Sequence, residues 1–249
     1  MNEQNNGRRV LLLGGSSDLS LSFLRSNDWN EKDWIIAQYC HHDEGLRKIA
    51  ATIPAKMELL HADFMSEDST NELAKLLVDK DFVPTHILHV PAVPVVNQRF
   101  TDIKWSEAES QIHVQCRSLM IVLQVVIRKM AKARTGKIVI GLSSCTLDVS
   151  PKYLASYVQA KYALMGLGKA LAAEYAPKGI LVNMISPSMM ETKFLRNVYS
   201  GVVEQSAMNN PMKRNTSPDD VGKLICYLFS ESNTFITGAN IPVTGGEVF

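Results

Sequence analysis

The chain has 249 residues, 46% of them hydrophobic and 20% charged, which is ordinary for a soluble globular protein. Its 26 Lys and Arg nearly balance its 25 Asp and Glu, so the net charge of +1 excludes a strongly basic protein built to bind nucleic acid. We find no apolar stretch of the roughly 18–20 residues that a membrane helix needs, no signal-peptide core in MNEQNNGRR and no paired cysteines for a metal or disulfide framework, so we expect a cytoplasmic protein without a metal.

Strand-like apolar runs alternate with helix-like runs along the whole chain. The predicted strands are RVLLLG (9–14), DWIIAQY (33–39), KMELLHA (56–62), THILHV (85–90), GKIVIGLSS (136–144), ILVNMIS (180–186) and NIPVTGG (240–246). Strands that alternate with helices predict crossover units and a parallel sheet, and strands apolar on both faces predict helices on both sides of it. We therefore expect an α/β fold: a single doubly wound, Rossmann-type domain over residues 1–249, with a seven-stranded parallel sheet flanked by helices.

The first strand runs into the segment LLLGGSSDLSLSFL (11–24), which is typical of a strand turning tightly into a helix at a dinucleotide site. Gly14 can make the tight turn, but Asp18 and Ser20 stand where two further glycines would be expected. Aspartate is a good helix N-cap, and if Asp18 caps the helix, its backbone N–H can still face a phosphate. We interpret the turn as a working phosphate loop; the alternative is a strand–helix turn that binds no ligand.

The helix-like segment 156–179 places Tyr157 and Lys161 four residues apart, hence on one helix face. An ammonium group near a phenol favours the phenolate and lowers its pKa, so this pair can transfer a proton near neutral pH. Such a pair alone is a weak signal. Ser144, thirteen residues before Tyr157 at the end of a predicted strand, strengthens it.

With these residues in this order, the chain resembles the single-domain short-chain dehydrogenase/reductases from about Arg8 to its C-terminus. The pattern is closest to that of the 3-oxoacyl-[acyl-carrier-protein] reductases. In the resemblance, Ser144, Tyr157 and Lys161 match the catalytic residues, and Gln115 matches the active-site Asn. The cofactor-binding positions that it implies are Gly14, Ser16, Ser17, Asp18, Leu19, Tyr39, Asp63, Phe64, Pro91, Ala92, Tyr157, Lys161, Pro187, Met190 and Thr192.

The resemblance also implies a mechanism. Tyr157 protonates a substrate carbonyl oxygen as hydride arrives, Ser144 holds that oxygen, and Lys161 lowers the Tyr pKa and binds the nicotinamide ribose. Gln115 is one methylene longer than the family's Asn, which normally positions a water near the lysine, so we expect an altered proton relay. The segment 90–93, VPAV, replaces the family's NNAG and lacks its bracing amides.

The function expected from this pattern is the NADP(H)-dependent reduction of a ketone to an alcohol, with a 3-oxoacyl thioester as substrate. NADP(H) is favoured over NAD(H) because Gln38 and Tyr39 offer no acid for the ribose 2′-OH. The alternative is a divergent nucleotide-binding subunit or sensor with little turnover. A lid at about 190–215 is expected to set the substrate.

The expected partners follow from the same resemblance. The first is a small-molecule or carrier-bound ketone. Basic residues near the ends of two helices have two interpretations: a docking site for an acyl carrier protein, or an ordinary solvated basic helix end that the helix dipole favours. A homo-oligomer, tetramer or dimer, is expected through the helices that contain Gln115 and Tyr157. No nucleic acid and no membrane is expected. The basic residues concerned are Arg128, Lys129, Lys132, Arg134 and Lys178.

Overall fold

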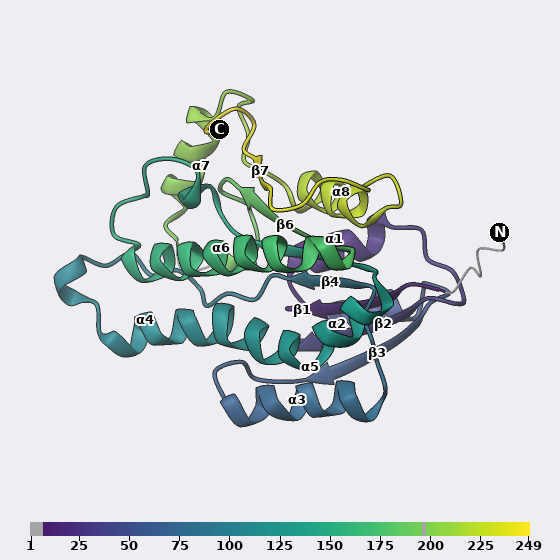
Figure 1. Ribbon diagram of the computed structural model, residues 1–249. Coiled ribbons are helices and arrows are strands. Elements are labelled where there is room, and N and C mark those ends of the chain that lie inside the picture. The colour runs from purple at the N-terminus through teal and green to yellow at the C-terminus, as the bar shows by residue number, and fades with distance from the viewer. Residues whose placement is uncertain (1–6, 196–197) are drawn as a thin grey trace.

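The computed structural model describes residues 7–195 and 198–249; residues 1–6 and 196–197, which belong to the predicted domain range and the predicted lid, lie outside them. A seven-stranded sheet forms the centre, in the order β3-β2-β1-β4-β5-β6-β7 (Figure 1). Every neighbouring pair is parallel. The strands are β1 Arg9–Leu13, β2 Trp34–Tyr39, β3 Lys56–His61, β4 His86–His89, β5 Gly136–Gly141, β6 Ile180–Pro187 and β7 Asn240–Val243. All seven predicted strands are confirmed.

Helices connect the strands by crossovers. The α-helices are α1 Asp18–Ser26, α2 Glu44–Ala50, α3 Glu67–Asp79, α4 Trp105–Ile112, α5 Ser118–Ala133, α6 Ala155–Tyr175, α7 Ser200–Asn209 and α8 Pro218–Phe229. A π-helical turn, His113–Arg117, joins α4 to α5 without a break. After α6, a 3-10 turn ends at Gly179, whose φ of 76° lies in the left-handed region that glycine adopts freely. The helix predicted over 156–179 is therefore confirmed with its stop.

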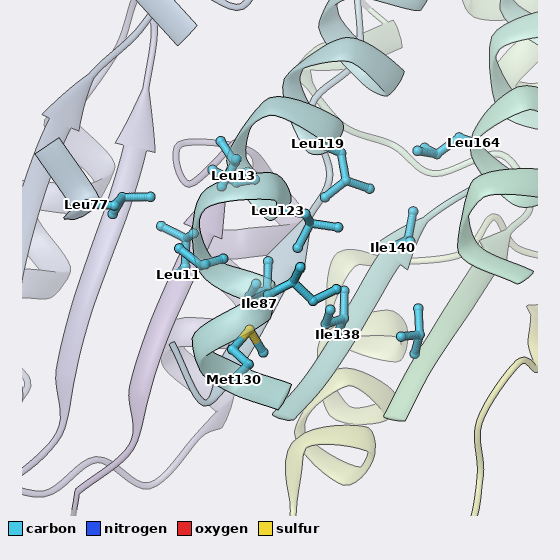
Figure 2. Packing of buried hydrophobic residues seen from close by; sticks show 14 of the residues in the cluster. Leu11, Leu13, Leu77, Ile87, Leu119, Leu123, Met130, Ile138, Ile140 and Leu164 are labelled. Carbon is cyan, nitrogen blue, oxygen red and sulfur yellow. The ribbon is translucent and has the colours of Figure 1, made fainter. Parts of the chain in front are cut away.

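Alternate residues of each strand face opposite layers of helices. Leu11 and Leu13 of β1 pack into the cluster formed with α3, α5 and α6, whereas Val10 and Leu12 pack into the cluster formed with α1, α2 and α8. Figure 2 shows the first cluster, in which Leu119 and Leu123 of α5 lie over the sheet residues. Burial on both faces explains why these strands are continuous apolar runs.

The helix from Trp105 to Ala133 is, by length and composition, long and apolar enough to cross a membrane, which differs from the expectation drawn from the sequence. However, 56% of its most apolar window is buried inside the fold. It covers the sheet as a core helix does, so its composition is explained by packing.

His86, on β4, is a buried titratable residue outside the predicted site. Its Nε2 lies 3.0 Å from the carbonyl oxygen of Phe229, and its Nδ1 lies 2.8 Å from Thr85 Oγ1. Burial lowers its pKa from 6.5 to about 4. Because the unfolded chain then binds more protons than the folded one between these two pH values, stability must fall as the pH drops through this window.

We expect His86→Gln to flatten that acid dependence. The free energy of unfolding of the wild type should fall by at most about 1.4 kcal/mol per pH unit through His86 below pH 6.5, and the variant should lose this contribution. Urea unfolding at pH 7, 6 and 5 measures the slope. His42→Gln, at an exposed histidine, is the matched control and should keep the wild-type slope. Equal slopes in wild type and His86→Gln would contradict the prediction.

Candidate active site

The carboxyl ends of the parallel strands meet at one edge of the sheet, which is where ligands bind in open α/β folds. The sequence-predicted residues follow these ends one by one. Gly14 follows β1, Tyr39 ends β2, Asp63 comes after β3, Pro91 after β4, Ser144 after β5 and Met190 after β6. The topology therefore brings residues far apart in sequence to a single edge.

The turn after β1 is held in a conformation that only glycine adopts easily. Gly14 has a φ of 80°, and a Cβ at this position would lie 3.0 Å from the backbone nitrogen of Pro91. The Gly14 N–H donates to Gln38 Oε1 at 2.8 Å, and Gln38 Nε2 donates to the carbonyl of Ala62 at 2.6 Å. Gln38 thus braces the turn. A buried amide within the apolar strand WIIAQY is the signal that could have revealed this role.

Ser17, and not Asp18, is the N-cap of α1. The Ser17 hydroxyl accepts from the Ser20 N–H at 3.2 Å, and the Ser20 hydroxyl donates to the Gly14 carbonyl at 3.0 Å. Asp18 is the first helical residue, and its Oδ2 accepts from the Lys193 N–H at 2.9 Å. The predicted cap was therefore wrong by one residue, because the serine before Asp18 already fills it.

The first turn of α1 has backbone N–H groups without intrahelical partners, and such groups suit a phosphate. Ser16, Ser17 and Asp18 are half-buried at this turn. Leu19 is buried in the core, so only its backbone can serve a ligand. The turn therefore offers the backbone groups that a phosphate loop uses, although two of the usual glycines are absent.

The ends of β2 and β3 lie at the same carboxyl edge of the sheet, next to the end of β1. The Tyr39 ring packs edge-on against His61, with 5.6 Å between the ring centroids. Burial, together with the negative charge of Asp63, raises the pKa of the Cys40 thiol. Phe64 is 3% exposed in the core, so its predicted cofactor contact is limited to backbone atoms.

Lys161 and Tyr157 are both buried on α6, on the side that faces the end of β5. Lys161 is 3% exposed; its Nζ donates to the Gly141 carbonyl at 2.7 Å and lies 5.6 Å from the centroid of the Tyr157 ring. Burial lowers the pKa of Lys161 from 10.5 to about 8. Burial also raises the pKa of Tyr157, against a smaller lowering by a hydrogen bond to Ser143. The lowering of the Tyr157 pKa by Lys161 that the sequence predicts is therefore not found, because burial dominates and raises that pKa.

Two serines lie beside Tyr157 after β5. The Ser143 hydroxyl accepts from the Cys145 N–H at 3.4 Å as the cap of a short 3-10 turn, and it acts to lower the pKa of Tyr157. Ser144 is half-buried, and within the described ranges no hydrogen bond uses its hydroxyl. Ser144 therefore has a hydroxyl that remains available to a substrate oxygen.

We expect Ser144→Ala to lower turnover by about 100-fold, the scale of losing one donor to a reacting oxygen. Ser143→Ala should lower turnover less, because the Ser143 hydroxyl is already engaged by the backbone of Cys145. Steady-state rates of the two variants, each corrected for the folded fraction, make the comparison. The reverse order would assign the substrate contact to Ser143.

The predicted lid begins above Tyr157. The rings of Phe194 and Tyr157 are tilted, with 6.1 Å between their centroids. The two residues share an apolar cluster, which makes the surroundings of the Tyr157 ring apolar. Its members are Val95, Cys145, Leu154, Tyr157, Val158, Phe194 and Val198.

A cavity of about 650 Å³ opens beside the first residues of the predicted lid, between α1 and the start of α8. Asp18, Thr192 and Lys193 line it, whereas Tyr157 and Lys161 do not. We therefore associate the cavity with the first turn of α1, where phosphates are expected to bind. We infer the position of the reacting groups from Tyr157 and Lys161 on α6.

The remaining predicted cofactor residues lie at or after the ends of β6 and β4. Pro187 ends β6 and is half-buried, as is Met190, which forms an isolated bridge with Thr216. The Thr192 hydroxyl donates to the Met190 carbonyl at 3.4 Å. Ala92 is half-buried and Pro91 buried in the segment that faces Gly14.

Gln115 is completely buried in the π-helical turn. Its side-chain Nε2 donates to Gln111 Oε1 at 2.7 Å, and Gln111 Nε2 donates to the Val93 carbonyl at 3.3 Å. The segment VPAV is thus tied to the helix by two glutamines. The segment 90–93 lacks side-chain amides of its own, but the helix supplies amides that brace it.

The family described as enoyl-(acyl carrier protein) reductase matches residues 30–247 of the chain. The chain is 33% identical over 178 residues to a 3-oxoacyl-[acyl-carrier-protein] reductase FabG of Buchnera aphidicola, which covers 71% of this chain and 72% of that protein. It is 30% identical over 185 residues to an acetoacetyl-CoA reductase of Allochromatium vinosum, covering 74% of each. The chain belongs to the short-chain dehydrogenase/reductase family.

Solved structures of other short-chain dehydrogenase/reductases share the fold. A structure of ElxO with NADP bound aligns with a TM-score of 0.83 at 23% identity, covering 97% of this chain and 98% of that one. The acetoin dehydrogenase YohF of Salmonella typhimurium aligns with a TM-score of 0.82 at 22% identity, covering 97% of each chain. As a member of this family, the chain is an NAD(P)-dependent oxidoreductase.

The residues of this short-chain dehydrogenase/reductase fit such a cofactor. At Gly14 there is no room for a side chain between the turn and Pro91, and the first turn of α1 presents backbone N–H groups beside it. No group of three or more metal-ligating side chains occurs in residues 7–195 and 198–249. The edge is therefore suited to bind a nucleotide through its backbone.

Proposed function

We propose that the chain reduces the ketone of a 3-oxoacyl thioester to an alcohol, with NADPH as the preferred cofactor. The observation that carries the proposal is the buried Tyr157–Lys161 pair at the carboxyl edge of the sheet, under an apolar lid. The relatives named for 3-oxoacyl-carrier and acetoacetyl-CoA reduction support the substrate class.

In the proposed reaction, a bound nicotinamide cofactor supplies the hydride to the carbonyl carbon. Tyr157 donates its phenolic proton to the carbonyl oxygen, so the ketone gains one hydride and one proton. The Ser144 hydroxyl holds that oxygen, and the Lys161 ammonium stabilises the phenolate that remains. The apolar cluster around Tyr157 excludes water and accepts the alkyl part of the substrate.

The test is a panel of acetoacetyl thioesters and simple ketones assayed with NADPH and with NADH. Consumption of NADPH with a thioester, and stoichiometric formation of the 3-hydroxyacyl product, would support the proposal. Cofactor binding without turnover on any ketone would favour the alternative, a nucleotide-binding subunit or sensor.

We expect NADPH to bind at least tenfold more tightly than NADH. Gln38 is 2% exposed and its side chain accepts from the Gly14 N–H. The end of β2 therefore has no carboxylate for a ribose 2′-OH. The nearest acid beyond it, Asp43, is paired with Arg47 at 2.6 Å, and the Arg47 side chain is 68% exposed and can reach a 2′-phosphate. Fluorescence titration with both cofactors measures the two Kd values.

Arg47→Ala is expected to reduce that preference, and Lys48→Ala, at the next exposed cation on α2, is the control. Tighter binding of NADH by the wild type would reverse the assignment. A loss of preference in both variants would show only a general effect of positive charge.

The same panel separates a free thioester from a carrier-bound one. Of the five basic residues expected to dock an acidic carrier, Lys129 is paired with Asp81 at 2.7 Å and Arg134 donates to the Pro177 carbonyl at 3.2 Å. Arg128, Lys132 and Lys178 are exposed. A carrier-bound substrate should be preferred at low salt and lose that preference as salt rises; equal rates at all salt concentrations would indicate a free thioester.

A further inference from the structure

His89 ends β4 and is completely buried. Its Nε2 lies 2.7 Å from the backbone carbonyl oxygen of Gln115, in the π-helical turn. A π-helical turn disturbs the regular ladder of helical hydrogen bonds and leaves room for such a side-chain partner. His89 therefore joins the central strand of the sheet to the one irregular turn of the α4–α5 helix.

The protonation of His89 follows from its partner. A carbonyl oxygen only accepts, so Nε2 carries the hydrogen and Nδ1 carries a lone pair. Burial lowers the pKa of His89 to about 3, so the ring is neutral at physiological pH. Nδ1 is thus an acceptor, and it is buried with no hydrogen-bond partner among the described residues.

A second acceptor in the same network is also without a partner. Gln115 Oε1 is buried and unbonded within the described chain, while Gln115 Nε2 is used by Gln111. Buried acceptors without donors are costly, and native proteins satisfy them with a nearby donor or an ordered water. The network of His89 and Gln115 therefore needs a donor from its surroundings.

Lys161 is the donor available on the neighbouring helix. Its ammonium has three N–H bonds, and one of them is used by the Gly141 carbonyl. The Gly141 residue follows Ile140, which pairs with His89 across β4 and β5, so the Lys161 ammonium is bonded next to the strand position that faces His89. Cys116, next to Gln115, donates its thiol to the carbonyl of Ala160 at 3.6 Å, so the π-helical turn packs directly against the residue before Lys161.

We propose that His89 is a positioning residue for the Tyr157–Lys161 pair: its Nε2–H holds the Gln115 carbonyl in place, and its Nδ1 accepts a hydrogen bond from a water that is bonded to the Lys161 ammonium. The Gln115 carbonyl is then occupied by the His89 Nε2–H, and the Nδ1 of the same ring is the acceptor that remains for Lys161. The inference rests on the proposed function for its catalytic consequence, but its hydrogen-bonding pattern does not.

The consequence for Lys161 has a definite sign. An acceptor that bonds to an ammonium favours its charged form. Loss of the acceptor should therefore lower the pH at which Lys161 deprotonates. The other titratable groups around Lys161 are Tyr157 on α6, Cys116 on the π-helical turn and Cys145 after β5. The pKa of Tyr157 and of both thiols is raised by burial, so these groups stay neutral near pH 8.

His89→Leu removes both hydrogen bonds and keeps an apolar side chain, while His89→Gln keeps a donor and an acceptor. In His89→Leu, the alkaline limb of the pH–turnover profile should move to lower pH by about 0.5 unit or more, with cofactor affinity at pH 7 changed by less than about threefold. His89→Gln should restore the limb. His86→Leu is the matched control, a buried histidine of the same strand bonded to Phe229, and its limb should stay where it is in the wild type.

Two measurements do not depend on ketone reduction. Nitrogen NMR of histidine-labelled wild type should show His89 in the Nε2–H neutral form from pH 5 to 9, and the pH dependence of NADPH binding should shift in His89→Leu as the turnover limb does. If the pH dependence of NADPH binding shifts in His89→Leu but the wild type turns over no ketone, the inference is supported and the proposed function is contradicted.

The inference is overturned if His89 is protonated on Nδ1 in the NMR experiment. It is also overturned if His89→Leu, corrected for its folded fraction, keeps both wild-type pH profiles. If His89→Leu does not fold, His89→Gln and His89→Ala are compared. An alkaline limb that is at the wild-type pH in His89→Gln and shifted in His89→Ala supports the proposal. An alkaline limb that is unshifted in both variants rejects it.

Discussion

Tyr157→Phe is expected to lower turnover by about 100-fold or more, because it removes the only group proposed to protonate the substrate oxygen. Tyr157 is 9% exposed and belongs to the apolar cluster that includes Phe194, so phenylalanine should fit without rearrangement. The Kd for NADPH should change little, since Lys161 and the turn at Gly14 are untouched. Steady-state kinetics and cofactor titration measure the two effects separately.

Tyr162→Phe is the matched control on the same helix, at a tyrosine that is 41% exposed. It should keep both turnover and stability. A wild-type rate in Tyr157→Phe would remove Tyr157 from the mechanism and leave the chain a nucleotide-binding protein whose chemistry lies elsewhere. An equal loss in both variants would indicate a general effect on α6.

The fold could be predicted from sequence because each strand carries its own evidence. A run such as RVLLLG is apolar at every position only when both faces of the strand are covered, and the structure buries Val10 and Leu11 in opposite clusters. The stop of α6 was equally local, since Pro177 and Gly179 act on the backbone next to them. Local rules and tertiary structure agree at these places.

The hydrogen bonds of the site could not be predicted in the same way. In the sequence, Gln38 marks only a missing acid, whereas in the structure it braces Gly14 from a neighbouring strand. The side chain of Asp18 reaches Lys193, 175 residues further along the chain. Which group a polar side chain contacts across the sheet depends on register and layer order, and neither is encoded in the spacing of one motif.

His89 is another residue whose hydrogen-bond partner could not be predicted from the sequence. In THILHV it interrupts an apolar strand, and without the fold a buried polar residue of this kind has no visible partner. Its partner is the backbone carbonyl of Gln115, which is available at a π-helical turn that no helical periodicity marks. The resemblance to the family points to the Gln115 side chain, whose amide instead pairs with Gln111.

Lys161→Met is expected to lower turnover by about 100-fold or more and to weaken NADPH binding, yet to preserve or increase stability. Lys161 is 3% exposed, its ammonium makes one protein hydrogen bond, and burial lowers its pKa from 10.5 to about 8. Burying this charge therefore costs free energy, at most about 3 kcal/mol from that difference. Methionine has a similar length and no charge, so it removes the cost while losing the bond to the Gly141 carbonyl.

The pH dependence of stability distinguishes this explanation from a simple packing effect. Because the folded-state pKa of Lys161 is the lower one, the unfolded chain binds more protons between pH 8 and 10.5, and wild-type stability should gain a rising contribution across that window. Lys161→Met should lack this rise, while Lys169→Met, at an exposed lysine of the same helix, should retain it. Denaturant unfolding from pH 7 to 10 measures all three proteins. A Lys161→Met variant that is less stable at pH 7 and keeps the wild-type slope would show that the ammonium is well solvated in the folded chain, and burial could then no longer tune the Tyr157–Lys161 pair.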